Sequence, residues 1–347
     1  MSRVTISDVA TAAGVSKTSV SFAFNQPERL GQATLDRVLG VAQDLGYAPL
    51  PAARALSTRR SGTVGLLIPQ RLSTLFANPF ASELIQGLGE LCEEHDLTLL
   101  LVPPLDGSLQ GAIRRAAVDG FISLGLSPDD RELDLLERLG IPTVLIDSES
   151  SPGHTVVNVD DAGGAEAAAQ HLLDLGHRRL AIMVLPPARS RMKHTPTATR
   201  RLAGYEAAIA RTEAERAHTV MAGISVAAGA RAFESLPRGG RRPTAVLAMS
   251  DMAAIGVVGA AREAGLRVPE DLSVVGFDDL PLAAWTNPPL TTVHQPIVEK
   301  GRLAVGLLIE RLNGRTVSSP PPLRTHLVLR SSTSKPIGGK EVVGAQA

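Results

Sequence analysis

Short apolar runs alternate with amphipathic stretches from Thr63 onward, and this alternation restricts the possible folds more than any other feature. Each run has the length of a strand and is rich in Val, Leu and Ile, and helical patterns separate the runs. Such alternation is typical of parallel sheets covered on both faces by helices. The expected strands are 63–68, 97–102, 120–124, 142–146, 179–184, 217–221, 244–249 and 272–277, and the expected helices include 81–95, 161–175, 200–211, 226–236 and 252–264.

Eight such units are too many for one small sheet, and the pattern breaks near 147–160. The chain has 347 residues, enough for two or three domains. We therefore expect two lobes of similar α/β build. The segment 186–199 lacks periodicity and is expected to be a loop.

The first 47 residues follow a different pattern, because they contain no strand-like run. Apolar residues recur at helical spacing over 6–13, 16–25 and 32–46, with Thr5 or Ser7 and then Ser16 available as N-caps. Residues 1–60 also carry a net charge of +3, and the remainder carries −3. A basic three-helix head on an acidic body suits a segment that binds phosphates.

The second predicted helix has two unlike faces. One face packs Val20, Ala23 and Phe24, and the other is rich in hydroxyl and amide groups, which suits a DNA major groove. Phe22 is an apolar residue on that polar face, where the methyl group of a thymine is a suitable partner. A three-helix dimerisation cap is the alternative interpretation. The polar face consists of Thr18, Ser21, Phe22 and Asn25, with Lys17 at its margin.

Residues 4–25, V-T-I-S-D-V-A-T-A-A-G-V-S-K-T-S-V-S-F-A-F-N, resemble the N-terminal signature of the LacI/GalR family of transcription regulators. The resemblance implies a helix-turn-helix domain over 1–48 that binds a near-palindromic operator as part of a homodimer. The family's base-reading positions correspond to Lys17, Thr18 and Phe22, and Phe22 departs from the polar residue often found there. Within the head, we expect DNA contacts from Thr5, Ser16, Lys17, Thr18, Ser21, Phe22 and Asn25.

Residues 47–57, Y-A-P-L-P-A-A-R-A-L-S, resemble the family's hinge, which folds into a short helix when two subunits meet on DNA, and we expect the hinge to span 49–60. There Leu56 would wedge between base pairs in the minor groove, and Arg54 would lie close to the DNA backbone. A segment this short is a poor helix by itself, so it needs a partner. An ordinary Pro/Ala linker is the alternative, and Leu50 stands where the family often has Asn.

The resemblance extends over most of 61–331, through landmarks such as N-P-F-A-S-E-L-I-Q-G (78–87) and P-E-D-L-S-V-V-G-F-D-D (269–279). It implies a two-lobed periplasmic-binding-protein-like core of doubly wound parallel sheets, crossed three times by the chain. The core would span 61–347, with a first lobe of about 61–160 and 292–320 and a second of about 161–291 and 321–335. A small carbohydrate-like effector would bind between the lobes, beyond the carboxyl ends of the strands.

Carried over by position, the family's effector contacts imply a site of carboxylates, one guanidinium and one aromatic ring. Carboxylates accept hydrogen bonds from hydroxyl groups, and an aromatic ring can stack on a sugar. An Asp after a strand can instead cap the next helix, and that alternative stays open. The expected contacts are Phe80, Asp147, Arg201, Ile224, Ser250 and Asp278, with Ala81 as a further wall position.

The expected site has fewer aromatic residues than the family pattern, because Ala81 and Ile224 stand at positions that are often aromatic. A basic loop over 189–194 raises the hypothesis of an anionic effector, such as a sugar phosphate. A solvated basic loop is the simpler interpretation.

An enzyme is the rival function for an α/β chain. No dinucleotide fingerprint, phosphate-binding loop or nucleophile elbow occurs, and His171 and His177 are wrongly spaced for metal ligands on one helix face. We therefore expect neither catalysis nor a cofactor or metal. Cys92 is the one cysteine and is expected in the core. An exported solute-binding protein is the second rival, but no signal peptide or membrane span is visible, so we expect a cytoplasmic protein.

Overall fold

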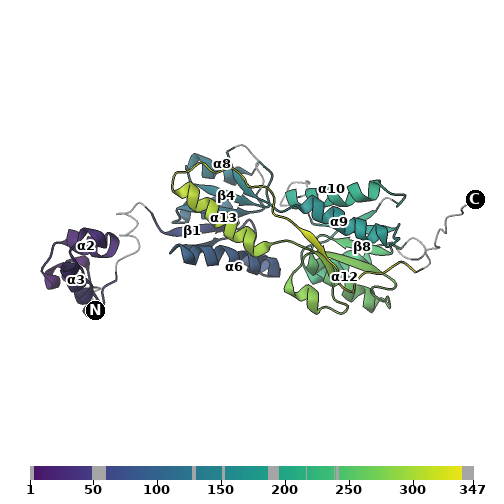
Figure 1. The fold of residues 1–347 in the computed structure, drawn as a ribbon, viewed down its shortest axis with the longest axis horizontal. Coiled ribbons are helices and arrows are strands. Elements are labelled where there is room, and N and C mark those ends of the chain that lie inside the picture. The colour runs from purple at the N-terminus through teal and green to yellow at the C-terminus, as the bar shows by residue number, and fades with distance from the viewer. Residues whose placement is uncertain are drawn as a thin grey trace, which may run out of the picture. The chain divides into compact units, whose positions relative to one another are not determined.

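The computed structural model describes residues 4–48, 60–126, 130–150, 153–186, 195–215, 217–237, 239 and 242–337. Two compact units are present, one formed by Met1–Thr63 with Ala117–Asp119 and the other by the rest of the chain (Figure 1). The predicted hinge contacts Arg54 and Leu56 and the basic loop 189–194 lie outside the described residues.

The head, residues 4–48, contains three α-helices, as predicted. They are α1 (Ile6–Ala13), α2 (Lys17–Asn25) and α3 (Gln32–Asp44), and a 3-10 turn, η1 (Pro27–Arg29), joins the last two. Val9, Val20 and Val38 are fully buried where the helices meet. Gly14 ends α1 in the left-handed conformation, with φ of 65°, which glycine adopts without steric cost.

The first lobe is built on a five-stranded sheet in the order β2-β1-β3-β4-β5. Its strands are β1 (Thr63–Leu67), β2 (Thr98–Val102), β3 (Gly120–Leu124), β4 (Thr143–Ile146) and β5 (Thr155–Val157), and the pairs from β1 through β3 and β4 to β5 are parallel. The helices of this lobe are α5 (Leu72–Leu75), α6 (Pro79–Glu94), α7 (Leu109–Arg115), α8 (Arg131–Arg138) and α13 (Ile297–Leu312). Helices α6 and α13 pack against each other.

The second lobe is built on a six-stranded sheet in the order β11-β10-β9-β8-β6-β7. Its strands are β6 (Leu180–Val184), β7 (His218–Met221), β8 (Ala245–Ala248), β9 (Ser273–Asp278), β10 (Thr291–His294) and β11 (His326–Val328), and β11 alone runs antiparallel to its neighbour. Helix α9 (Asp161–Asp174) packs on α10 (Pro196–Ala210), and α11 (Val226–Glu234) on α12 (Asp251–Glu263). A short 3-10 helix, η3 (Pro281–Trp285), follows β9.

The chain passes between the lobes three times, as predicted. It leaves the first sheet after β5, returns between β10 and α13, and leaves again between α13 and β11 (Figure 1). Because β10 belongs to the second sheet, the middle crossing falls between His294 and Ile297, a few residues later than the expected boundary at 292. All eight predicted strands are confirmed to within one or two residues.

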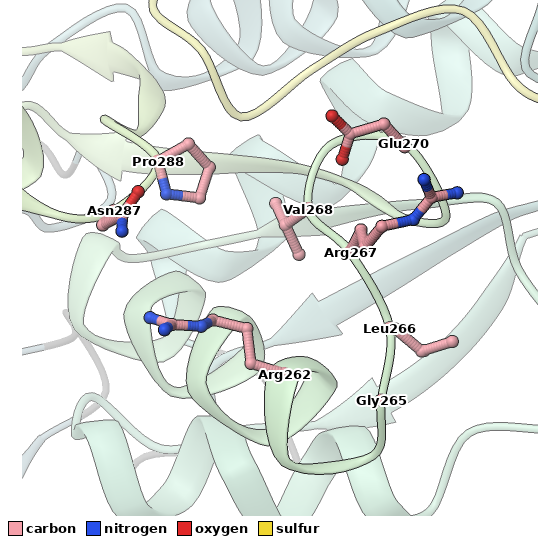
Figure 2. A pocket seen from close by; sticks show the side chains of 8 residues that line it. All are labelled: Arg262, Gly265, Leu266, Arg267, Val268, Glu270, Asn287 and Pro288. Carbon is pink, nitrogen blue, oxygen red and sulfur yellow. The ribbon is translucent and has the colours of Figure 1, made fainter.

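Cys92 is buried in the core of the first lobe, as predicted, and burial raises the pKa of its thiol to about 11. Within the described ranges, no helix combines the length and apolar character needed to cross a membrane. A cavity of about 450 Å³ lies in the second lobe near the end of α12 (Figure 2), and none of the predicted contact residues is among those that line it.

Candidate functional site

The second helix of the head has the two faces expected from its sequence. Val20 and Ala23 are buried in the head, and Phe24 packs edge-on against Tyr47 with ring centroids 5.7 Å apart. These contacts hold the opposite face of α2 outward. On that face Lys17 and Thr18 are exposed, and Ser21, Phe22 and Asn25 are half-buried.

Two of the predicted DNA contacts fix the starts of helices. The Ser16 hydroxyl oxygen accepts a hydrogen bond from the Ser19 amide over 3.0 Å and so caps α2. The amide and the hydroxyl of Thr5 both donate to Asp8 Oδ2 over 2.8 Å. These two hydrogen bonds hold the pKa of Asp8 below its ordinary value. Thr5 and Ser16 thus orient α1 and α2, and their contacts with DNA stay predictions.

Phe22 is less exposed than expected for an aromatic on the outer face. Its ring is half-buried, and the Arg29 guanidinium carbon lies 5.2 Å from the ring centroid. Nearby, the Asn25 side-chain amide donates to Ser21 Oγ over 3.3 Å. The Asn25 Oδ1 atom is buried and has no hydrogen-bond partner within the described head.

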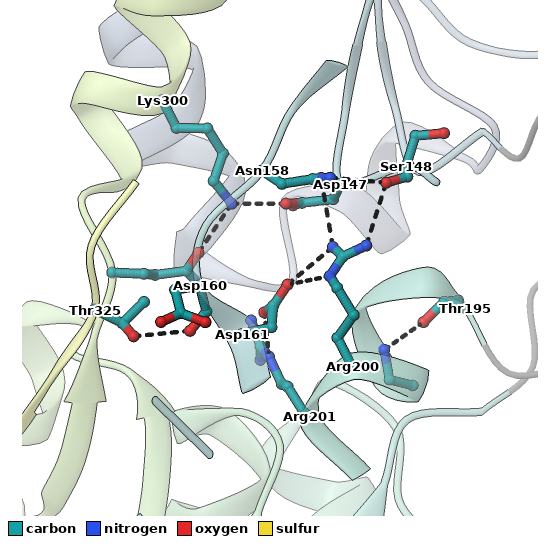
Figure 3. Close-up of polar contacts among 12 residues, drawn as sticks. Asp147, Ser148, Asn158, Asp160, Asp161, Thr195, Arg200, Arg201, Lys300 and Thr325 are labelled. Carbon is teal, nitrogen blue, oxygen red and sulfur yellow. Dashed lines mark hydrogen bonds and ion pairs between the residues drawn. The ribbon is translucent and has the colours of Figure 1, made fainter. Parts of the chain in front are cut away.

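In the core, the predicted contacts Asp147 and Phe80 meet at a buried lysine. Lys300 Nζ, on α13, donates to Asp147 Oδ1 over 2.8 Å (Figure 3) and lies 5.3 Å from the centroid of the Phe80 ring. Asp147 directly follows β4 and has a φ of 56°. Because Lys300 is 0% exposed, its charge needs the partners that surround it.

The same lysine connects the carboxyl ends of strands in the two sheets. Lys300 Nζ donates to Gln295 Oε1 over 2.9 Å, and Gln295 Nε2 donates to Asp278 Oδ1 over 2.6 Å. Asp278 is the last residue of β9. A continuous line of polar contacts therefore runs from Asp147 in the first lobe to Asp278 in the second.

Arg201 extends this line into the second lobe. Its Nε donates to Asp161 Oδ1 over 2.9 Å, and its Nη1 lies 3.6 Å from Asp278 Oδ1. Arg200 Nε donates to Asp161 Oδ2 over 2.9 Å, and Arg200 Nη1 reaches the Ser148 carbonyl oxygen of the first lobe over 3.2 Å (Figure 3). We call Asp147, Asp161, Arg200, Arg201, Asp278, Gln295 and Lys300 the interlobe network.

The remaining predicted contacts differ in how closely they join this network. Ser250 caps α12 by accepting from the Ala253 amide over 3.2 Å, and the carbonyl of the preceding residue, Met249, accepts from Arg201 Nη1. Ser250 is 2% exposed. Ile224 lies just after β7, is half-buried and has no recorded contact with the network.

Burial dominates the electrostatics of the network. It raises the pKa of Asp278 to about 6, although Arg201 acts in the opposite direction. Burial and the neighbouring Asp278 raise the pKa of Asp251 well above its ordinary value. Burial alone would lower the pKa of Arg201, but Asp161 and Asp278 outweigh it and raise that pKa.

Four members of the network were not predicted from the sequence: Asp161, Arg200, Gln295 and Lys300. Gln295 lies within the family-like segment 288–296, and Arg200 directly precedes the predicted contact Arg201. Closeness in the sequence to these positions could therefore have indicated both residues. Lys300 lies in a helical segment with no such signal, and the fold alone brings it to Asp147. In the sequence, Asp161 looks like an acidic residue that stabilises the first turn of a helix. The structure places it in the first turn of α9, where it also binds both arginines.

Two family models match the chain. The model described as bacterial regulatory proteins, lacI family, matches residues 5–49, and the model described as periplasmic binding protein-like domain matches residues 169–333. Among curated proteins, the transcriptional regulator CelR of Thermobifida fusca is 33% identical over 340 residues, which cover 95% of this chain and 98% of the relative. The ribose operon repressor of Escherichia coli K12 is 33% identical over 323 residues, 90% of this chain and 94% of the relative.

Solved structures give the same picture. A lac repressor dimer bound to operator and the anti-inducer ONPF matches with a TM-score of 0.83 and 26% identity, covering 96% of this chain and all of the other. A CelR–cellobiose complex matches with a TM-score of 0.72 and 30% identity over 95% of this chain and all of the other. A ribose-bound regulator from Enterococcus faecium matches with a TM-score of 0.69 and 27% identity over 79% of this chain and 99% of the other.

Proposed function

The chain belongs to the lacI family of bacterial regulatory proteins and is a DNA-binding transcriptional regulator, and we propose that it is a homodimeric repressor controlled by a neutral polyhydroxyl effector. The outer face of α2 would bind the major groove of each operator half-site. The proposed DNA contacts of the head are Thr5, at the start of α1, Ser16, at the start of α2, and Lys17, Thr18, Ser21, Phe22 and Asn25 on α2.

One observation carries the effector proposal, namely that the interlobe network joins the strand ends of both sheets. Asp147 and Asp278 follow or end strands in different lobes, and Lys300 and Gln295 connect them. A ligand that bonds to both carboxylates changes the relation of the lobes through its different affinity for their arrangements. The proposed contacts are Phe80, Asp147, Arg201, Ile224, Ser250 and Asp278.

The charge balance of the network favours a neutral effector over an anionic one. Each cation in it is paired: Lys300 with Asp147, Arg200 with Asp161, and Arg201 with Asp161 and Asp278. Carboxylates and paired guanidinium groups suit the hydroxyl groups of a sugar. Similar regulators have been solved with cellobiose and with ribose, which are ligands of this class.

Calorimetry on the full-length protein tests the effector class. Cellobiose and ribose would be titrated beside glucose 6-phosphate and ribose 5-phosphate, with operator affinity measured by fluorescence anisotropy with and without each sugar. The expected result is binding of a neutral sugar that changes operator affinity. Binding of only the phosphates would overturn the neutral class.

We also propose that the protein has no catalytic activity and acts in the cytoplasm, where its DNA target lies. Its relatives are regulators rather than enzymes, which supports the first statement. Recovery of each titrated sugar unchanged after prolonged incubation with the protein is the expected outcome.

A further inference from the structure

Arg29 and Phe22 form a pair on the DNA-binding side of the head. Phe22 is on α2, and Arg29 ends η1, the turn that follows α2. The guanidinium carbon of Arg29 lies 5.2 Å from the centroid of the Phe22 ring. A guanidinium at this distance from an aromatic ring is attracted to the negative face of the ring by a cation–π interaction.

The ring is the partner that the structure records for this guanidinium. Within the described residues, no carboxylate lies within ion-pair distance of Arg29, whereas Arg200, Arg201, Arg267 and Arg302 each have one. Arg29 is exposed and Phe22 is half-buried. The contact with the ring limits where the guanidinium can go. Because no described carboxylate pairs with it, its N–H groups can donate to a bound partner.

We propose that Phe22 and Arg29 act as one base-reading unit, in which the ring holds the guanidinium and the guanidinium donates to the O6 and N7 atoms of a guanine. This inference rests on the proposed binding of α2 in the major groove. A planar guanidinium matches the two acceptors of guanine, and Arg–guanine is the commonest specific contact in that groove. The role of Phe22 is then to position Arg29, and the thymine methyl suggested by the sequence is replaced as its main partner.

The pair also explains why an apolar side chain is tolerated on a polar face. A half-buried ring that is partly covered by a guanidinium exposes less apolar surface than a free aromatic. Arg29 would set the preference for guanine. Because Arg29 lies outside α2, the residues of α2 alone do not predict this preference. A phosphate contact from Arg29 is the main competing outcome, because it would raise affinity without selecting a base.

Selection from a randomised duplex pool tests the pair, using the full-length wild type and the variants R29K and F22L. Lys keeps the charge but loses the planar donor pair, and Leu keeps apolar bulk but loses the ring. The expected result is one guanine position in each half-site that the wild type selects and both variants select less well. Direct affinity measurements should show a roughly five- to hundredfold loss of discrimination at that position for R29K. The slope of log affinity against log salt should stay nearly unchanged.

R37K is the matched control, because Arg37 is an exposed arginine on α3 and the same charge is kept. It should select the same sequences as the wild type, and circular dichroism should show that all variants fold. If R29K selects the same sequences as the wild type, the proposed pair is wrong. It is also wrong if R29A loses the same affinity for all duplexes and its slope of log affinity against log salt is lower by about one per half-site, because Arg29 then contacts a phosphate. The proposed pair is likewise wrong if F22L loses selection at a thymine position and R29K does not. A wild type that selects no sequence overturns the proposed function itself.

Discussion

At the scale of single residues, Lys300 and Asp147 form a buried pair whose partners depend on each other. Lys300 is 0% exposed, and the Asp147 side chain is 12% exposed. K300M leaves the carboxylate without its cation, and D147N leaves the ammonium without its anion. Each change should lower the free energy of unfolding by roughly 3–5 kcal/mol, because one charge stays buried and unpaired. Urea unfolding of the full-length protein measures this loss.

The double variant separates pairing from packing. D147N/K300M removes both charges, so its loss should be smaller than the sum of the single losses by at least about 1 kcal/mol. R302M is the control on the same helix, because Arg302 makes ion pairs with Glu90 and Glu94 at the surface. The loss for R302M should be much smaller than that for either single variant of the buried pair, because solvent screens these surface ion pairs. Strictly additive losses in the buried pair would contradict the prediction.

Asp278 should make the stability of the core depend on pH. Burial raises its folded pKa to about 6, against an ordinary value of 3.8. Between these two values the folded protein binds more protons than the unfolded chain, so stability contributed by this group is present below pH 4 and is lost as pH rises through 6. The wild type should therefore lose stability relative to D278N by at most about 3 kcal/mol between pH 4 and 7. Urea titrations between pH 4 and 7 measure the free energy of unfolding of both proteins. An equal pH dependence in the wild type and D278N would contradict the prediction.

The residues of the network differ in how visible they are in the sequence. Asp147 and Asp278 follow or end strongly apolar strands, so their meeting at the strand ends can be predicted from the pattern. Lys300 has no local signal, because its position depends on how α13 packs and on the crossing of the chain after β10. The Arg29–Phe22 contact is similarly hidden, since the turn η1 decides where Arg29 lies.

At the scale of elements, close helix packing depends on glycines at the crossing points. Gly204 on α10 faces α9, and a Cβ there would overlap the carbonyl oxygen of Ala162. G204A should destabilise the second lobe by about 1–3 kcal/mol, because the helices must move apart. Thermal and urea unfolding measure this effect.

Gly259 on α12 provides the matched control in the same lobe. Nothing lies within 4 Å of a Cβ at this position, and the residue is exposed. G259A should therefore stabilise the protein by roughly 0.5–1 kcal/mol, since alanine is the better helix former. If G204A and G259A change the free energy of unfolding by similar amounts, α9 and α10 can move apart at their crossing point without a loss of stability.

The strands that the sequence pattern missed are short or polar. β5, β10 and β11 have three or four residues each, and β10 reads T-T-V-H, which gives no apolar run. Such strands form because neighbours already in the sheet supply their hydrogen bonds, for example β9 for β10. Helix α13 was equally absent from the predicted elements, and its place on the first lobe follows from the chain crossing.

At the scale of the whole molecule, the proposed dimer needs a surface on each copy that gains from being covered. Trp285 is 85% exposed, and Leu282 on the same short helix η3 is 44% exposed. Large aromatic side chains are rarely left in water without a partner, and they dominate the energy of interfaces. We therefore expect η3 to lie in the contact between two copies.

W285S should weaken the dimer by at least about 2 kcal/mol, which is more than tenfold in its dissociation constant. Operator affinity should fall with it and should recover as protein concentration rises, because a monomer engages only one half-site. Sedimentation equilibrium measures the first effect, and anisotropy at several protein concentrations measures the second. L139S is the control, since Leu139 is 45% exposed at the end of α8 in the first lobe. Equal weakening by both variants would point to general destabilisation, whereas an unchanged W285S dimer would place the contact on another face.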